Sequence, residues 1–207
     1  MIYTHIAWTP GTKSMAENYK PIFEMHRDED WVCIIDSDAM MITDRTWYAQ
    51  LEHAIQKYPK AKGFTCRTNR VNSIPQLIEG VDPDNHDIKY HKKVGEYMEN
   101  RFYKKVTPHF DKKYGGHFSG MWFALHVGTM KEIGFYDSGN LSMTDNAIHK
   151  WLIEAGHEFY VLDGIYCYHY YRPENEWDYY KKGTKELQEH FTTINLQPMW
   201  YKGENNA

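Results

Sequence analysis

Two acidic residues directly follow an apolar run in the first quarter of the chain. Asp36 and Asp38, separated by Ser37, come after Trp31–Ile35. An apolar run without alternation is typical of a strand covered on both faces, so we expect the carboxylates beyond the carboxyl end of a buried strand. There they can bind a hard divalent cation together with the oxygens of a diphosphate. The cation can then neutralise the negative charge that builds up on the diphosphate as it leaves. A solvated acidic turn is the alternative interpretation.

Strand-like and helix-like patterns alternate along the chain. Apolar runs predict strands over 2–8, 31–35, 62–67, 118–125, 159–162 and 165–168. Apolar residues at helical spacing predict helices over 13–26, 44–58, 87–103, 129–134, 144–155 and 177–191. Pro21 is expected to kink or divide the first helix, Thr43 to cap the second, and Gly156 to end the fifth. Asp163-Gly164 predicts a turn between the last two strands. Strands that alternate with helices indicate an α/β layered fold.

The length and charge of the chain restrict its class. Its 207 residues suffice for one domain, which we expect to span 1–207, and are few for two. Acidic and basic residues are interspersed and the net charge is −4, which argues against a nucleic-acid-binding protein. Aromatic residues make up 16% of the chain, a share that suits either stacking on sugar rings or ordinary packing.

Cysteine usage and hydropathy favour a soluble protein. Cys33, Cys66 and Cys167 lie in apolar or aromatic runs without CxxC spacing, so we expect reduced, buried thiols rather than disulfides. No stretch approaches the roughly 18 apolar residues of a membrane span, and no signal-like segment opens the chain. We therefore expect a cytoplasmic protein that is a monomer or a small homo-oligomer.

Several short motifs follow one another in a characteristic order. They are Gly11, Ala16-Glu17-Asn18, Asp36-Ser37-Asp38, Phe118-Ser119-Gly120, Ile133-Gly134-Phe135-Tyr136-Asp137, Thr144-Asp145-Asn146, Ala155-Gly156-His157 and His169. Their order and spacing resemble those of the family 2 glycosyltransferases and their relatives with the GT-A fold. The resemblance covers most of the chain except 80–116 and the tail. It implies a Rossmann-like three-layer sandwich with a mainly parallel central sheet.

The resemblance also implies a metal site. Asp36 matches a residue that contacts the donor ribose or the metal, and Asp38 matches a direct metal ligand. His169 matches a position that supplies a second protein ligand in several GT-A enzymes, although a lone histidine among tyrosines is ordinarily a packed or capping residue. Mixed carboxylate and imidazole ligation suits Mn²⁺ at least as well as Mg²⁺.

Asp145 matches the residue that acts as general base in inverting members of the family. Such a base takes the proton of the acceptor hydroxyl during in-line attack, and a helix N-terminus is a fixed place to hold it. The simpler interpretation is a capping or first-turn acid favoured by the helix dipole. Thr144 stands where the family often has Glu, so the acidic pair is incomplete.

Donor and acceptor contacts are expected on the segments around these motifs. The family has a second strand, ending in an acid that reads the nucleotide base, where this chain has only residues 9–15. The donor-binding candidates are Thr9, Pro10, Lys13, Asn18, Asp36, Ser37, Asp38 and Arg67. The acceptor-binding candidates are Ser119, Gly120 and Trp122. A solvated loop is the alternative for Arg67, and core packing for Trp122.

The resemblance implies a metal-dependent transferase that moves a sugar, with inversion, from a UDP- or GDP-sugar to an acceptor that the sequence does not identify. Residues 80–116 are expected to form an acceptor-side insertion or lid, and 172–207 an aromatic tail. Three alternatives stay open. They are a retaining GT-A enzyme, a silent nucleotide-sugar- or glycan-binding domain, and a sugar-phosphate nucleotidyltransferase, although residues 9–13 make a poor phosphate-binding loop for the last of these.

Overall fold

The computed structural model describes residues 1–7, 15–71, 73–109, 117–135 and 144–170. In these ranges the strands are β1 (Ile2–Ile6), β2 (Trp31–Ile35), β3 (Ala39–Met41), β4 (Ala61–Thr68), β5 (Val106–Pro108), β6 (Trp122–His126) and β7 (Glu158–His169). The α-helices are α1 (Met15–Glu24), α2 (Trp47–Lys57), α3 (Ile88–Phe102), α4 (Val127–Ile133) and α5 (Thr144–Glu154), with a short 3₁₀ helix at Ile74–Gln76.

The described strands form one mixed sheet, so the expected α/β class is confirmed and the expected mainly parallel sheet is wrong. The strand order is β1-β2-β6-β4-β7-β3, with β5 added against β7. The pairs β1 with β2 and β4 with β7 are parallel. β6 runs antiparallel to both β2 and β4, and β7 runs antiparallel to β3 and β5. An apolar run buried on both faces reads the same in either direction, so the pattern at 118–125 did not predict the direction of β6.

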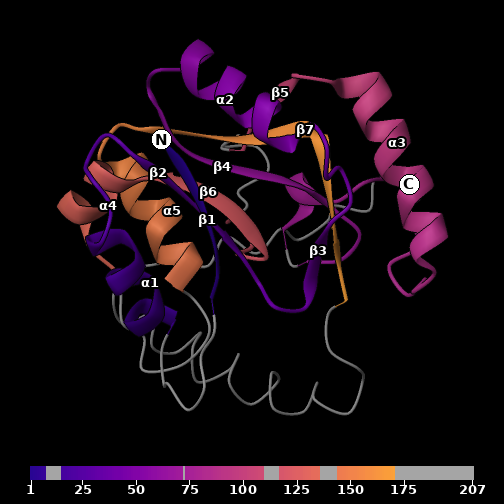
Figure 1. Ribbon diagram of the computed structural model, residues 1–207, viewed down its shortest axis with the longest axis horizontal. Coiled ribbons are helices and arrows are strands. Elements are labelled where there is room, and N and C mark those ends of the chain that lie inside the picture. The colour runs from indigo at the N-terminus through magenta and orange to yellow at the C-terminus, as the bar shows by residue number, and fades with distance from the viewer. Residues whose placement is uncertain (8–14, 72, 110–116, 136–143, 171–207) are drawn as a thin grey trace, which may run out of the picture.

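Helices cover both faces of the sheet, which gives three layers. Figure 1 shows α1, α4 and α5 grouped together, apart from α2 and α3. On β2, Val32 and Ile34 pack in the core on the α1, α4 and α5 side. Trp31 and Cys33 pack in the core on the α2 side. Successive side chains of a strand point to opposite faces, so two buried faces require the continuous apolar run seen in β2.

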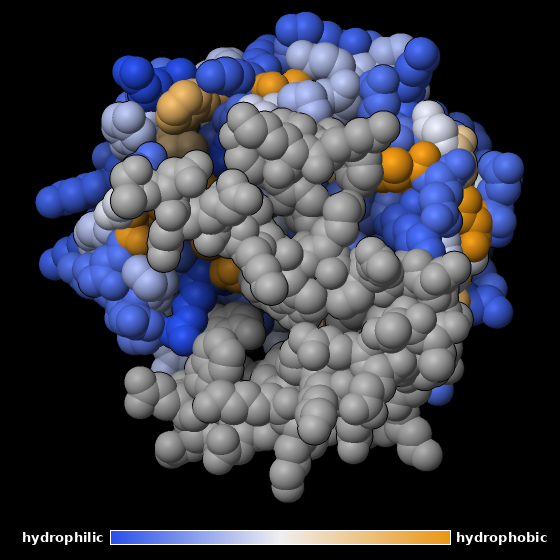
Figure 2. Space-filling model, turned by 180° about the vertical axis from the view of Figure 1, so that it is seen from behind, coloured by the Kyte–Doolittle hydropathy of each residue, from blue (hydrophilic) through white to orange (hydrophobic). Residues whose placement is uncertain are grey.

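The described residues on the face drawn in Figure 2 are mainly polar. Figure 2 shows mainly hydrophilic residues with small, separate hydrophobic patches on that face. All three cysteines are buried free thiols, as expected. No helix in the described ranges combines the length and apolar character needed to span a bilayer.

Two predicted helix features differ in the structure. Pro21 lies inside α1, so it does not divide the helix, and the expected kink stays a prediction. The second helix begins at Trp47 with Thr46 in the N-cap position, so Thr43 is not its cap. The hydroxyl of Thr43 instead accepts a hydrogen bond of 3.0 Å from the backbone N–H of Tyr166. A threonine hydroxyl bonds a neighbouring strand as readily as a helix end, so local sequence did not separate the two.

The predicted turn at Asp163-Gly164 is wrong, because β7 runs unbroken through both residues. The register against β4 shifts at this point, between Leu162 and Tyr166 of β7, which is the signature of a bulge. Gly164 sits at the bulge because its missing side chain leaves room for the side chain of Gln50 and the carbonyl of Phe102. Glycine in a strand marks a bulge as well as a turn.

The helix predicted over 87–103 is α3, with Asp87 accepting from the N–H of Lys89 as its N-cap. Gly156 has the positive φ expected after α5. Residues 80–109 of the predicted insertion contain α3 and β5, both packed against β7. Residues 110–116, the tail 172–207 and the helix expected over 177–191 lie outside the described residues.

Candidate metal centre

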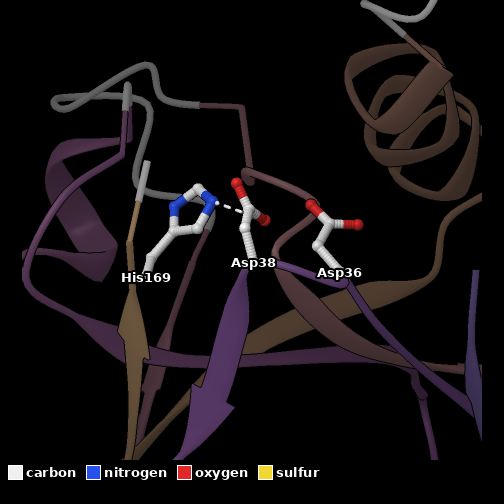
Figure 3. Close-up of side chains that lie close together, drawn as sticks. All are labelled: Asp36, Asp38 and His169. Atoms are coloured by element: carbon white, nitrogen blue, oxygen red, sulfur yellow. Dashed lines mark ion pairs between the residues drawn. The ribbon is translucent and has the colours of Figure 1, made fainter. Parts of the chain in front are cut away.

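Asp36, Asp38 and His169 lie together at one end of the sheet, as the sequence predicts. Each offers one ligand atom, and these atoms all lie within 4.8 Å of one another. Figure 3 shows Asp38 between the other two side chains, with its carboxylate facing the imidazole of His169. The imidazole is buried and both aspartates are partly exposed, so the cluster is open to a ligand from the aspartate side.

Backbone pairing brings the three residues together. Ala39, at the start of β3, pairs with His169, at the end of β7, and the N–H of Tyr170 donates to the carbonyl of Asp38 over 2.9 Å. The N–H of Ala39 donates to the carbonyl of Asp36 over 3.1 Å, so the chain turns tightly between β2 and β3. This turn keeps both carboxylates beside the end of β7.

Hydrogen bonding fixes the orientation of the His169 ring. Its Nδ1 lies 2.9 Å from the carbonyl oxygen of Arg70, which can only accept, so Nδ1 carries the proton. Nε2 then faces Asp38, 3.4 Å from Oδ1. A metal-binding histidine usually donates its other ring N–H to a carbonyl or carboxylate in this way.

Asn69 is a site residue that the sequence analysis did not identify. Its side chain accepts the backbone N–H of His169 at 2.8 Å and donates to the backbone carbonyl of His169 at 3.1 Å. The amide thus pairs with His169 as a neighbouring strand would, and Asn69 is itself buried. The only signal in the sequence is a polar residue directly after the strand that ends at Thr68, and such residues are common.

The electrostatics of the cluster suit a cation. Burial lowers the pKa of His169, but the hydrogen bond and charge of Asp38, the Arg70 carbonyl and the charge of Asp36 together raise it above the usual value. The two carboxylates thus stabilise positive charge at Nε2. Two carboxylates and an imidazole form an oxygen and nitrogen ligand set that fits a divalent metal, whose binding would displace that proton.

Asp145 lies in the first turn of α5 with its carboxylate held by two backbone N–H groups. Oδ2 accepts from Gly120 at 2.9 Å and Oδ1 accepts from Asn146 at 2.8 Å. Burial raises the pKa of Asp145 to about 6, against the lowering effect of these hydrogen bonds. Burial, and then the charges of Asp36 and Asp145, raise the pKa of Tyr19, so both carboxylates lie near the same buried phenol.

The segment around Ser119 is fixed by a second residue that the sequence analysis did not identify. Gln76 accepts the N–H of Ser119 at 2.6 Å, and its amide donates to the carbonyl of Ser119 at 3.1 Å. The same amide donates to the hydroxyl of Thr65 at 2.8 Å. Because Gln76 is fully buried, this network positions Ser119 and Gly120 rigidly beside Asp145.

Two predicted contact residues make contacts within the fold. Trp122 is buried and packs edge-on against Trp47 in the core on the α2 side, with ring centroids 6.1 Å apart. The guanidinium of Arg67 donates to Oδ1 of Asp163 at 2.9 Å and to the carbonyl of Pro75 at 2.6 Å. These contacts favour core packing for Trp122 and a structural ion pair for Arg67.

The other predicted donor contacts are only partly placed. Ser37 is exposed between the two aspartates, and Asn18 is partly buried on α1. Thr9, Pro10 and Lys13 lie outside the described residues. The structure therefore brings together Asp36, Asp38 and His169, with Gly120 and Asp145 as a neighbouring pair.

No protein-family model matches this sequence. None of the curated proteins compared with it is significantly similar.

Proposed function

We propose that this protein is a metal-dependent glycosyltransferase that uses a nucleotide-sugar donor and inverts the configuration of the transferred sugar. The observation that carries the proposal is the convergence of Asp36, Asp38 and His169 from separate parts of the chain onto one point. The second support is a carboxylate with a raised pKa, Asp145, on a neighbouring segment.

On the donor side, Asp38 and His169 would hold Mn²⁺ or Mg²⁺, and Asp36 would hold the metal or the donor ribose. The cation would supply the positive charge that stabilises a leaving nucleoside diphosphate. A UDP- or GDP-sugar is the proposed donor. Ser37 and Asn18 are proposed to contact it, together with Thr9, Pro10 and Lys13.

On the acceptor side, Asp145 is the proposed general base. Its carboxylate would take the proton from the acceptor hydroxyl as that oxygen bonds to the anomeric carbon and the bond from this carbon to the diphosphate breaks. A pKa of about 6 leaves the group ionised at neutral pH yet more basic than an ordinary aspartate. Gly120 is proposed to line the acceptor path because its backbone N–H donates to this carboxylate, and Ser119, the residue before it, is proposed to line the same path.

The test is a thermal-shift screen of UDP, GDP, ADP, CMP and dTDP, each with and without Mn²⁺. A ligand at 100 times its dissociation constant adds about 2.7 kcal/mol to the free energy of unfolding, which is readily detected. We expect one nucleotide class to stabilise the protein only when Mn²⁺ is present. Asp38→Ala should abolish this effect, whereas Asp44→Ala, at an exposed aspartate of the next segment, should not.

Stabilisation by no nucleotide, or stabilisation that is the same without metal, would overturn the donor site. If the donor site is found, the configuration of the product separates inverting from retaining transfer. Nucleotide binding without turnover on any acceptor would instead favour a silent binding domain.

A further inference from the structure

Two histidines at the edge of the sheet direct a ring nitrogen at the same point. His5 belongs to β1 and His26 follows α1. Their Nε2 atoms lie 2.8 Å apart. Both residues are partly exposed, so ions in solution can reach them. Within the described part of the chain, this is the one hydrogen bond that either ring makes.

The surroundings hold both rings in place. His5 is fixed by the parallel pairing of β1 with β2, in which it lies opposite Ile34. The His26 ring stacks on Tyr3, with centroids 4.1 Å apart and planes 22° from parallel. The carbonyl of His26 accepts a hydrogen bond of 2.7 Å from Nζ of Lys131. Two imidazoles on separate elements thus converge because the backbone places them there.

The distance between the nitrogens is close to that of a chelate. Without a metal, one ring donates its proton to the lone pair of the other. If both rings carry the proton on Nδ1, both Nε2 lone pairs converge on one point. Zinc–nitrogen bonds of about 2.0–2.1 Å at a tetrahedral angle put two nitrogens about 3.3 Å apart. Small side-chain rotations would therefore open this pair enough to admit a metal ion.

We propose that His5 and His26 form a two-imidazole site for a divalent transition metal of the zinc, nickel or copper class, with water completing the coordination. Imidazole suits these ions, whereas carboxylates suit harder ions such as Mg²⁺ and Mn²⁺. The site therefore differs in metal preference from the cluster of Asp36, Asp38 and His169. A bound ion would link the edge strand β1 directly to the chain segment that follows α1.

The test is titration with Ni²⁺ by calorimetry at pH 7.5, in the double variant Asp36→Ala/Asp38→Ala, which lacks the carboxylates of the other cluster. We expect one equivalent of Ni²⁺ to bind. Adding His5→Ala or His26→Ala should weaken binding at least about tenfold, because each removes one of two protein ligands. His53→Ala, which removes a partly exposed histidine of α2, should leave binding unchanged. Paramagnetic resonance of the Cu²⁺ form should show coupling to two imidazole nitrogens.

Either of two results would overturn the site. One is the absence of Ni²⁺ binding in the double variant. The other is a Ni²⁺ affinity that stays the same as that of the double variant when His5→Ala or His26→Ala is added. His5→Gln and His26→Gln repeat the comparison with side chains closer in size to histidine, and circular dichroism checks that each variant is folded. Because no nucleotide is used and the other cluster is disabled, this result is independent of the proposed transferase activity.

Discussion

The backbone N–H of Gly120 donates a 2.9 Å hydrogen bond to Oδ2 of Asp145, and the carbonyl of the next residue, Met121, accepts the N–H of Asp36 at 3.0 Å. One short segment therefore contacts both the proposed base and the first aspartate of the proposed metal site. A shift of this segment would move the two together. The geometry thus couples the donor and acceptor halves of the proposed site through the backbone of residues 120–121.

Asp145→Asn is expected to lower turnover about 100-fold or more while metal-dependent nucleotide affinity stays within a few-fold. The amide keeps the size of the side chain but cannot take a proton. In the wild-type protein, kcat should rise with pH through about 6, where Asp145 ionises, and then level off. Steady-state kinetics from pH 5 to 8 check both points, with Asp44→Asn as the matched control. Full turnover by Asp145→Asn would rule out this base and favour a retaining mechanism.

Asn69→Ala is expected to weaken Mn²⁺ binding about 10- to 100-fold, the usual effect of losing a residue that orients a metal ligand. The substitution removes both hydrogen bonds that fix the backbone of His169. Asn69→Asp retains only the acceptor for the N–H of His169. Titration calorimetry with Mn²⁺ measures the change, and Asn100→Ala on the exposed side of α3 is the control. Unchanged Mn²⁺ affinity would show that His169 needs no such support.

Arg67→Ala is expected to lower the free energy of unfolding by about 3 kcal/mol, because Asp163 would lose its charged partner while remaining buried. Nucleotide affinity should not change, since the guanidinium is directed at Asp163 and Pro75. Urea denaturation and nucleotide titration of the same variant separate the two effects. Weaker nucleotide binding at unchanged stability would restore Arg67 to the donor site.

Mild acid is expected to destabilise the fold through three clustered histidines. Burial, with the charges of His117 and Arg67, lowers the pKa of His109 to about 3, and burial also lowers the pKa of His117 and His149. Below about pH 6.5 these histidines bind protons in the unfolded chain but stay neutral in the folded chain. Their contribution to the free energy of unfolding is therefore complete above pH 6.5 and is lost as the pH falls towards 3. Between about 6.5 and 3, His109 alone raises the unfolding constant about tenfold for each unit by which the pH falls.

Urea denaturation at pH 7 and pH 5 measures this slope directly. His109→Gln should flatten the pH dependence by about one decade per pH unit, the contribution of one histidine. His53→Gln on α2 is the control and should leave the slope unchanged. An equally steep dependence after His109→Gln would assign the acid sensitivity to other groups.

Local patterns predicted the elements that carry the chemistry because those elements have strong periodic or apolar signals. The run Trp31–Ile35 is a strand with the predicted bounds, and α5 begins at Thr144 and ends within one residue of the prediction. Asp36 and Asp38 follow directly from the end of that strand. Pairing Asp38 with His169, in contrast, depends on the register of β3 against β7, which no local pattern contains.

The residues that sequence reasoning missed act through long-range backbone contacts. Asn69 and Gln76 bind the backbone of His169 and Ser119, far away in the chain, and their own surroundings are ordinary polar segments. The partner of Arg67 was not predicted for the same reason, because Asp163 lies in a segment predicted to turn. A bulge and a turn have the same glycine signal, and only tertiary packing against Gln50 and Phe102 distinguishes them here.

The unbroken course of β7 makes the length of that strand part of the site. Leu162 and Tyr166 flank the bulge, and His169 ends the strand. Since side chains alternate between the faces of a sheet, deleting or inserting one residue between the bulge and His169 would turn the imidazole to the opposite face. Exchanges of one apolar residue for another at Ile165 or Cys167 should therefore be tolerated far better than any change in the number of residues. Alterations of chain length in this segment would remove the proposed metal ligand even if every named residue were kept.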